Sequence, residues 1–495
     1  MNSKFESTRE QNIACSASQA VIKGIASDGG LFVRRDMENL KINISELKGK
    51  KYTEIAEIIL SKILDDYSEK SIKYCVESAY DKKFSSNDIT PLVKVGNDYI
   101  LELFHGPTSA FKDVALSVLP YLSTEALKLN KIKEKILILT ATSGDTGKAA
   151  LEGFKNIEGI KILVFFPNDG VSKVQEKQMI SQDGNNTYVY AINGNFDDAQ
   201  SEVKKIFTDE EVKKKLKNKN YSLSSANSIN IGRLVPQIVY YFYSYMKLAE
   251  SNEISLGEKV NFTVPTGNFG DILAGYYAEL MGLPVNKLIC ASNENNVLYD
   301  FIQTGTYDRN RPFYKTLSPS MDILISSNLE RLIYHLSGND NKYIKSLMDE
   351  LKSDGKYTVT QEIKSCIDNL FYAGYTNDLQ TSETIKNVYN EYNYLLDTHT
   401  AVAYNVMKEF KEKDSNHKNI VLATASPYKF SKAVYESLFG ENNSDEFKIM
   451  ELLSEKTGVP IPENLKNLKN KKDIHTSIIN KEDMKNCFEV ILWLL

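Results

Sequence analysis

A lysine at residue 112 stands in a setting that suits covalent chemistry. It lies in the segment Phe-His-Gly-Pro-Thr-Ser-Ala-Phe-Lys-Asp, residues 104–113, where a strand pattern ends and a helix pattern begins after a Gly-Pro turn. Thr108 or Ser109 is the predicted N-cap, which puts Lys112 in the first helical turn. The positive end of a helix lowers the pKa of an ammonium, and a neutral amine is what Schiff-base formation requires. A surface lysine paired with Asp113 is the alternative.

Two glycine-containing loops follow predicted strands elsewhere in the chain. Residues 142–147 read Thr-Ser-Gly-Asp-Thr-Gly, and residues 264–271 read Val-Pro-Thr-Gly-Asn-Phe-Gly-Asp. Small residues at the start of a helix let backbone N–H groups converge on an anion. The first loop has neither the Gly-x4-Gly-Lys spacing of a nucleotide-binding loop nor a dinucleotide fingerprint. Each loop alone can be a tight turn, but two loops and a lysine at a third strand end can face one crevice.

Two further segments carry polar groups that suit a ligand. Residues 225–233, Ser-Ala-Asn-Ser-Ile-Asn-Ile-Gly-Arg, offer amides, hydroxyls and Arg233 to a phosphate or carboxylate, or alternatively a polar cap for the next helix. Thr424, after a strand pattern at 420–423, offers a hydroxyl to a heterocycle nitrogen, or lies in an ordinary loop. The five histidines form no metal-binding pair, so no metal site is predicted, and His105 and His399 are typical of structural hydrogen-bonding residues.

Strand and helix patterns alternate from about residue 96 onward. This alternation predicts an open parallel sheet, or two, wrapped by helices, with ligands at the carboxyl ends of the strands. The predicted strands cover residues 99–104, 135–141, 160–166, 187–192, 260–264, 288–291 and 420–423. The predicted helices cover residues 110–128, 146–154, 171–181 and 271–281.

The remaining patterns predict how the chain divides. Residues 1–95 are predicted to be mostly helical, with helices at 52–63 and 68–79, and strand signals vanish between about 303 and 397. We therefore expect an N-terminal domain, a large domain that contains a helical insert, and a small α/β domain. Their expected ranges are 1–95 for the first, 96–135 with 225–495 for the second (insert 303–397), and 136–224 for the third.

The composition is that of a globular protein without an obvious macromolecular partner. The 495 residues are 42% apolar and 25% charged, and the net charge of -5 argues against a nucleic-acid-binding protein. Five scattered cysteines argue against a disulfide framework and fit reduced thiols in a cytosolic compartment. Neither a secretory signal nor an apolar run of membrane-spanning length is present, so a soluble, cytoplasmic protein with no membrane contact is expected.

Taken together, these motifs resemble the threonine synthase family of fold-type II pyridoxal-phosphate (PLP) enzymes. The resemblance implies a tryptophan synthase β-like α/β fold, with two open, mostly parallel sheets flanked by helices and a small N-terminal domain. It runs nearly end to end and rests on residues 7–9, 27–33, 106–108, 110–113, 143–147, 227–228, 230, 233, 267–271, 318–322, 326–328, 399–401 and 424–425.

The resemblance also implies a role for each motif. Lys112 is the Schiff-base lysine and the proton shuttle, and Thr424 is the hydroxyl partner of the pyridine nitrogen. Many members have His at the position of Ser426, beside that partner. The loop that holds the PLP phosphate comprises Gly267, Asn268, Phe269, Gly270 and Asp271. The implied substrate-binding residues are Ser143, Gly144, Asp145 and Thr146 for the carboxylate, and Asn227, Ser228, Asn230 and Arg233 for the phosphate.

The implied reaction converts O-phospho-L-homoserine and water into L-threonine and phosphate, the last step of threonine biosynthesis, in a monomer or homodimer. Two alternatives differ in what they predict. Another PLP lyase of this fold, such as a threonine dehydratase-like deaminase or a phospholyase, keeps Lys112 and the phosphate loop but yields 2-oxobutyrate. A non-catalytic relative that senses anions or acts as a scaffold has no lysine-linked chromophore.

Overall fold

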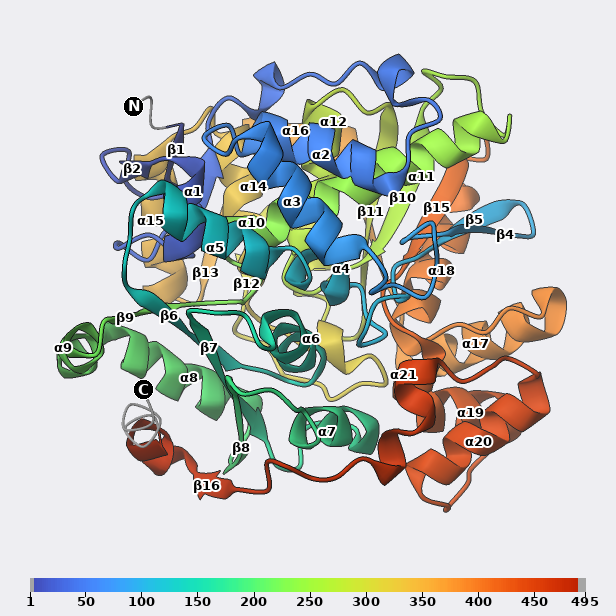
Figure 1. Cartoon of the computed structure of the whole chain (residues 1–495). Helices are drawn as coiled ribbons and strands as arrows, with labels where there is room; N and C mark the ends of the chain where they lie inside the picture. Colours follow the sequence, from blue (N-terminus) through green and yellow to red (C-terminus); the bar gives the residue numbers. More distant parts are fainter. Residues whose placement is uncertain (1–3, 488–495) are drawn as a thin grey trace.

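A six-stranded sheet forms the centre of the larger part of the molecule. The computed structural model describes residues 4–487, and its sheets and helices are drawn in Figure 1. The strand order is β14-β11-β10-β15-β5-β4, and every neighbouring pair is parallel except β4 with β5. The strands are β4 (Leu92–Val95), β5 (Asp98–Glu102), β10 (Val260–Pro265), β11 (Val285–Ser292), β14 (Phe371–Tyr375) and β15 (Lys418–Ala423).

Both faces of this sheet are covered by helices. Along β15, Ile420 and Leu422 belong to one hydrophobic cluster, whereas Val421 and Ala423 belong to another. Since successive side chains of a strand point to opposite faces, the two clusters lie on the two sides of the sheet. Helices α11 (Ile238–Glu250) and α12 (Gly270–Leu280) contribute to the first cluster, and α18 (Thr398–Lys411) contributes to the second.

A second, entirely parallel sheet of five strands lies below the first in Figure 1, in the order β16-β8-β7-β6-β9. Helices α6 (Asp145–Phe154) and α8 (Phe196–Thr208) contact its strands, and α7 (Lys173–Ile180) packs against α6. The strands are β6 (Lys135–Ala141), β7 (Ile160–Pro167), β8 (Thr187–Asn193), β9 (Tyr221–Ser224) and β16 (Ile478–Asn480). The two open sheets with flanking helices confirm the predicted architecture.

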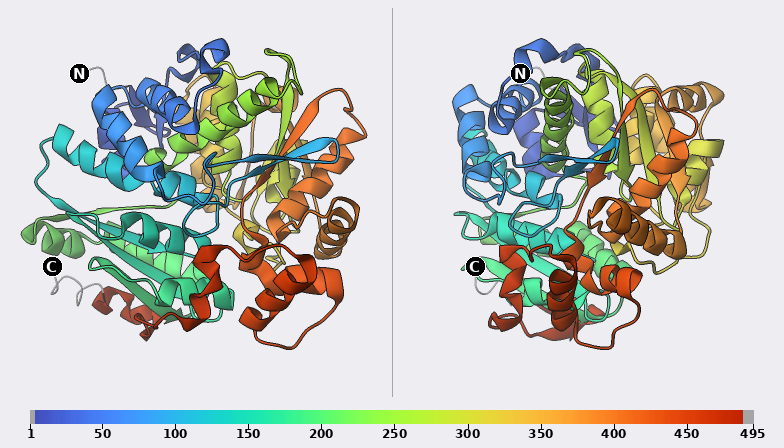
Figure 2. Two further views of the ribbon diagram at one scale, coloured as in Figure 1. Left: turned by 45° about the vertical axis from the view of Figure 1, so that its right-hand side comes forward. Right: turned by 90° about the vertical axis from the view of Figure 1, so that its right-hand side faces the viewer.

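Strand β16 comes from the C-terminal part of the chain. After α19 (Ser431–Phe439), α20 (Glu446–Thr457) and α21 (Glu463–Lys466), the chain runs beneath the second sheet and adds β16 to its edge (Figure 2). The range 136–224, expected for the small domain, does not include this strand. A strand of three residues is too short to show a hydrophobic period of two, so the sequence pattern did not predict it.

The N-terminal segment is built from helices and a small sheet. Helices α2 (Tyr52–Ile63) and α3 (Glu69–Tyr80) match the two predicted helices, and α1 (Ala17–Lys23) precedes them. The mostly helical prediction missed an antiparallel sheet of three strands, each of two or three residues: β1 (Phe5–Ser7), β2 (Ala14–Cys15) and β3 (Phe32–Arg34).

One sequence expectation differs from the structure at the edge of the large sheet. Strand signals vanish in residues 303–397, yet β14 lies there, together with the short pair β12 (Thr306–Asp308) and β13 (Lys356–Thr358). Gly374 of β14 makes room for Val406, because an added Cβ would lie 2.7 Å from that side chain. The insert also contains helices α14 (Leu329–Leu336), α15 (Asn341–Ser353), α16 (Gln361–Leu370) and α17 (Asp378–Tyr392), and α13 (Val297–Thr304) ends where it begins.

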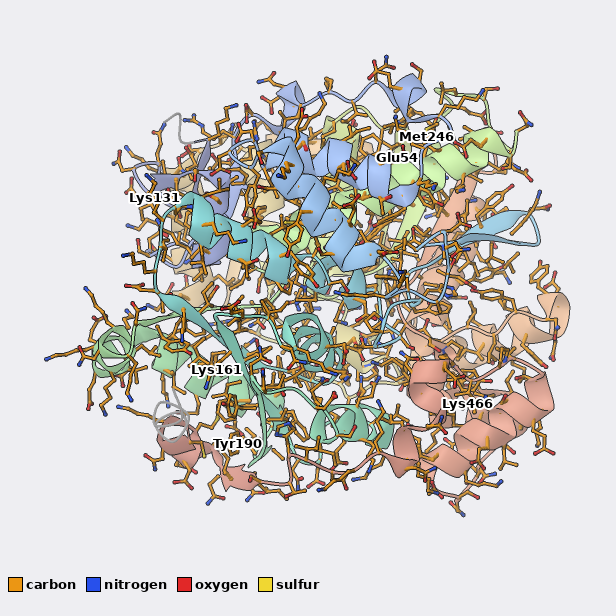
Figure 3. The ribbon with its side chains drawn as sticks, viewed as in Figure 1. Glu54, Lys131, Lys161, Tyr190, Met246 and Lys466 are labelled. Carbon is orange, nitrogen blue, oxygen red and sulfur yellow. The ribbon has the colours of Figure 1, made fainter. Side chains whose placement is uncertain are left out.

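The helix predicted over residues 110–128 is two helices. The structure has α4 (Lys112–Leu116) and α5 (Leu119–Leu129), and Pro120 stands in the first turn of the second. Proline lacks an N–H group and clashes with the preceding turn, so it starts a helix more readily than it continues one. Side chains fill the space between the ribbons (Figure 3). Among residues 4–487, no helix is both long and apolar enough to cross a membrane.

Candidate active site

The turn before Lys112 is held by the carboxylate of Asp113. Asp113 accepts hydrogen bonds from the backbone N–H of Thr108 at 2.8 Å and from its hydroxyl at 2.6 Å. An added Cβ on Gly106 would lie 2.3 Å from Asp113 Cβ, so the turn needs glycine there. Burial raises the pKa of Asp113 to about 6, although the bonds from Thr108 lower it. The alternative in which Asp113 pairs with a surface lysine is therefore wrong.

Lys112 is the first residue of α4, and only 8% of it is exposed. Its Nζ lies 3.6 Å from Asp145 Oδ2. The predicted cap is wrong: Phe111 occupies the N-cap position and caps nothing with its side chain. Burial lowers the pKa of Lys112, Asp145 opposes this effect, and Arg233 reinforces it. Desolvation is the largest of these influences, and α4, with five residues, is a short helix.

The loop of residues 142–147 starts α6 and faces Lys112. Gly144 has a φ of +131°, and an added Cβ would lie 2.6 Å from Gln175 Cδ, so both the backbone and the space require glycine. Thr142 Oγ1 accepts from the N–H groups of Gly144 at 3.0 Å and Gly147 at 2.9 Å. Gly144 provides no side-chain cap for α6, so an anion here would meet the remaining N–H groups of the loop. Thr142 was not predicted as a site residue.

The second predicted anion loop precedes α12 and is held by residues 326–328. Gly267 O accepts from the hydroxyl of Ser326 at 2.7 Å, and Asn268 O accepts from the backbone and side-chain N–H groups of Asn328 at 3.1 and 3.0 Å. Phe269, at the N-cap position, has the left-handed φ of +61° and no side-chain cap. The first N–H groups of the eleven-residue helix α12 therefore have no capping side chain and can meet a phosphate.

Asp271, in the first turn of α12, carries an unused buried oxygen. Its Oδ1 accepts from the hydroxyls of Tyr240 at 2.5 Å and Tyr241 at 3.1 Å. Its Oδ2 is buried and has no hydrogen-bond partner within the described part of the chain. Burial raises the pKa of Asp271 to about 6, while the two tyrosines and Lys112 lower it. The role of these two tyrosines as donors was not predicted from the sequence.

The segment 225–233 contains one unpaired cation and one amide that is fully used. Arg233 is buried and donates to Ala226 O at 3.0 Å, and no acidic side chain in residues 4–487 lies within ion-pair distance of it. Burial lowers its pKa to about 10. The Asn230 amide donates to Val21 O and Ser225 O, both at 3.1 Å, and its oxygen accepts from the next helix. Asn230 therefore supports the loop and has no N–H group left for the substrate phosphate.

Asn227 and Ser228 stand differently from Asn230. Both are half-buried, and no hydrogen bond from their side chains is found between residues 4 and 487. They are therefore available to a ligand. Arg331 of α14 holds the same segment from behind, through hydrogen bonds to Ile229 O at 2.6 Å and Phe32 O at 3.0 Å.

The loop after β15 lies directly beside the lysine segment. Thr424 O accepts from the Phe111 N–H at 2.8 Å, and Ala110 and Ala425 form an isolated antiparallel bridge. Thr424 is 6% exposed, close enough to the lysine segment to meet the same ligand. Ser426 accepts from Tyr428 N and so caps the short helix at Pro427–Phe430, a function that a histidine would not perform in this way.

Three residues that no pattern assigned to the site complete it. Ser320 Oγ lies 3.3 Å from Asp145 Oδ2, and Ser320 O lies 3.1 Å from the position of an added Cβ on Gly267. His399 holds Ser320: its Nε2 accepts the Ser320 N–H at 3.1 Å, and its Nδ1 lies 3.0 Å from Asp397. The third is Lys429, whose ammonium bonds Asp145. A lone lysine between aromatic residues gives no periodic signal, so only the tertiary structure revealed it.

The structure thus brings the predicted loops together around one lysine. Contacts link Lys112 to the loop after β6, that loop to Ser320, Ser320 to the loop after β10, and the loop after β15 to the residue before Lys112. All these loops stand at carboxyl ends of parallel strands, as the fold class predicts. A buried lysine with a lowered pKa, together with an uncapped helix terminus, suits an aldehyde cofactor that bears a phosphate and is held as a Schiff base, as in the pyridoxal-phosphate-dependent enzymes.

The comparisons with known proteins agree with that class. A family described as "Pyridoxal-phosphate dependent enzyme" matches residues 87–425, "Threonine synthase N terminus" matches residues 4–80, and "Threonine synthase, C-terminal" matches residues 400–491. Threonine synthase of Pseudomonas aeruginosa is 38% identical over 88% of this chain and 91% of its own length. Human threonine synthase-like 1 is 39% identical over 85% of this chain, and the matched part covers 58% of the length of the human protein.

A solved structure extends the similarity to three dimensions. The crystal structure of PLP-bound threonine synthase from Brucella melitensis superposes with a TM-score of 0.88 at 37% identity, covering 99% of both chains. The chain therefore belongs to the threonine synthase family of pyridoxal-phosphate-dependent enzymes.

Proposed function

We propose that the chain converts O-phospho-L-homoserine and water into L-threonine and phosphate, with pyridoxal 5'-phosphate bound through Lys112. The observation that carries this proposal is the buried Lys112 amine, 3.6 Å from Asp145, among loops that end four parallel strands. The relatives named threonine synthase support it, since one of them matches over 91% of its length.

The residues present fit this cofactor. The N–H groups at the start of α12 suit its phosphate, and a Cβ on Gly267 would make a tight contact of 3.1 Å with Ser320 O, which glycine avoids. The unpartnered Oδ2 of Asp271 offers a hydrogen-bonding atom on the same turn. In this proposal Gly267, Asn268, Phe269, Gly270 and Asp271 hold the phosphate. The hydroxyl of Thr424 would hydrogen-bond the cofactor's pyridine nitrogen. A neutral hydroxyl would not keep that nitrogen protonated as a carboxylate would.

When bound, the cofactor supplies an electron sink for the electron pair that remains when a proton leaves the substrate's Cα. The chain supplies the base. Burial favours the neutral Lys112 amine, which would accept the proton from the substrate's Cα. The same amine, on one face, can serve the proton transfers at Cα and Cβ that precede departure of phosphate from Cγ and addition of water at Cβ.

The substrate's two anionic ends would lie at the two remaining loops. Ser143, Gly144, Asp145 and Thr146 form the proposed carboxylate site, while Asn227, Ser228 and Arg233 form the proposed phosphate site, with Asn230 as support. Arg233 suits a phosphate because its planar guanidinium is buried and no carboxylate neutralises it in the described chain.

The decisive test is product analysis with purified protein and O-phospho-L-homoserine. We expect phosphate and threonine in equal amounts, and a yellow protein whose colour is lost in Lys112→Ala. Release of 2-oxobutyrate without threonine would assign the chain to another lyase of this fold. A colourless parent protein would favour a non-catalytic relative.

We further propose a cytoplasmic location, because of the scattered cysteines, and no nucleic-acid partner, because of the net charge of -5. The proposal also includes a monomer or homodimer and no membrane partner. The expected three domains remain a prediction, now with the C-terminal strand β16 placed on the smaller sheet.

A further inference from the structure

One buried carboxylate joins two lysines across the proposed active site. Asp145 Oδ1 accepts from Lys429 Nζ at 2.8 Å and from the Gln175 side chain at 2.8 Å. Asp145 Oδ2 lies 3.6 Å from Lys112 Nζ and 3.3 Å from Ser320 Oγ. Each oxygen of the carboxylate therefore faces a different lysine, and the shorter contact belongs to the lysine that has no predicted role.

Lys429 is completely buried, with an exposed fraction of 0%. Besides Asp145, its ammonium donates to Thr108 O at 3.1 Å and to the Gln178 side-chain oxygen at 3.1 Å. Three acceptors match the three N–H bonds of an ammonium, so the group is fixed in one orientation. A buried charge is costly to remove from water unless it is paired, and Asp145 is the pairing group.

The arrangement has a consequence for the reactive lysine. Two carboxylate oxygens held by Lys429, Gln175 and Ser320 cannot turn to form a tight ion pair with Lys112. A tight pair would keep the Lys112 amine charged, whereas a neutral amine is the form that reacts. At the same time, a carboxylate 3.6 Å away still attracts and orients the amine when it carries a proton.

We propose that Lys429 is a positioning residue of this site, which holds Asp145 at a distance that orients the Lys112 amine without keeping it permanently charged. The inference rests on the proposed role of Lys112, but its consequence is a property of the amine and can be measured without the reaction. Lys429 also neutralises a carboxylate in the loop proposed to bind the substrate carboxylate, where an uncompensated Asp145 would repel it.

The other charged groups that face these side chains remain the same in all variants. Arg233 on α10 (Ile231–Leu234) and Asp271 on α12 act on Lys112, and Asp113 on α4 acts with Lys429. Replacing Lys429 or Asp145 one at a time therefore isolates the effect of each charge on Lys112. Asp145 raises the pKa of Lys112 and Lys429 lowers it, so removal of one charge and removal of the other must shift the titration of Lys112 in opposite directions. A merely structural role for Lys429 would not produce opposite signs.

The experiment measures the reaction of the Lys112 amine with cyanate as a function of pH, in the full chain stripped of cofactor, by mass analysis of the peptide that contains Lys112. Only the neutral amine reacts, and at each pH the rate is divided by the concentration of isocyanic acid, the reactive form of cyanate, so the midpoint of the resulting curve reports the pKa of Lys112. We expect the midpoint to fall by about one unit in Asp145→Asn, because an opposite charge within ~4–6 Å shifts a pKa by ~1–3 units. We expect it to rise by about one pH unit or more in Lys429→Met, because this variant removes a like charge that lowers the pKa of Lys112.

Lys429→Arg, which keeps the charge, should stay near the parent midpoint. A midpoint in Lys429→Met that is unchanged or lower would overturn the inference. If Lys429→Met does not fold, Asp145→Asn decides: an unchanged or higher midpoint there contradicts the contact on which the inference depends. A chain that titrates as expected but makes no threonine would refute the proposed function and leave the positioning role of Lys429 in place.

Discussion

Gly153 of α6 is the point at which the helix of the smaller sheet touches the helix that carries Lys112. A Cβ added there would lie 2.1 Å from Leu116 O and 2.9 Å from Leu116 C, both backbone atoms of α4. Ordinary contact begins at 3.4 Å, so Gly153→Ala requires the two helices to separate by 3.4 − 2.1 = 1.3 Å. Backbone atoms cannot rotate away, so the helices themselves must move.

The separation has two expected effects. Overpacking of this kind destabilises by about 3 kcal/mol at the upper end of its range, and the better helix propensity of alanine returns about 1 kcal/mol, so we expect a net loss of about 2 kcal/mol. Lys112 and Asp145, 3.6 Å apart, are the first residues of the two helices. A displacement of about 1 Å at reacting groups reduces the rate by about 100-fold, so kcat/KM should fall by one to two orders of magnitude, ~10–100-fold.

Urea unfolding followed by circular dichroism measures the first effect, and phosphate release from O-phospho-L-homoserine measures the second. Gly159→Ala is the matched control, because nothing lies within 4 Å of its added Cβ and only its φ of +77° is unfavourable. The control should lose about 1 kcal/mol through backbone strain and keep its rate. A Gly153→Ala protein with the parent's stability and rate would refute the interpretation that α4 and α6 are packed without room for a methyl group.

Three further outcomes are expected. Burial raises the pKa of Asp271 to about 6 from an ordinary ~3.9, so the native state binds this proton more tightly than the unfolded state does. The stabilisation from the bound proton is complete below about pH 4 and is lost, by about 3 kcal/mol, as the pH rises through 6. Asp271→Asn should remove this loss, which urea unfolding from pH 4 to 7 measures. Arg331→Met should lower the free energy of unfolding by about 3 kcal/mol, because buried carbonyl groups lose a charged donor. The control Arg309→Met should change it by less than about 0.5 kcal/mol, because the hydrogen bond from Arg309 to Lys352 O is exposed. Equal losses in the two variants would contradict the role assigned to Arg331. Gly267→Ala brings a Cβ within 3.1 Å of Ser320 O and should weaken cofactor binding about tenfold, or ~1.4 kcal/mol, in a titration followed by absorbance.

Long, apolar elements were predictable from local sequence. Strand β6 and helix α2 have the predicted bounds, because seven and twelve residues are enough to show their hydrophobic periods. Short strands were not predictable: β14 and β16 have five and three residues, and sheet neighbours distant in sequence hold them in place. The break between α4 and α5 had a visible cause in Pro120, which the helix prediction over 110–128 did not weigh.

The candidate site was likewise predictable only in part from local sequence. The types and order of the loop residues, including the lysine at 112, indicated a covalent PLP site, because glycines, a hydroxyl and an amine at strand ends are local features. What surrounds them was decided by the tertiary structure: burial of Lys112 is the largest cause of its lowered pKa. Asn230 supports its loop instead of facing the substrate phosphate, because Val21 and Ser225 take its two N–H bonds.

The sequence by itself therefore determined the class of chemistry and the loops that carry it. The tertiary structure alone decided which charges meet. Lys429 lies 284 residues beyond Asp145 in the chain (429 − 145), yet their side chains form a 2.8 Å ion pair that no window of neighbouring residues contains. The physical reason is that a period or a motif reports the geometry of one element, whereas desolvation and Coulomb interactions depend on every group that packing brings near.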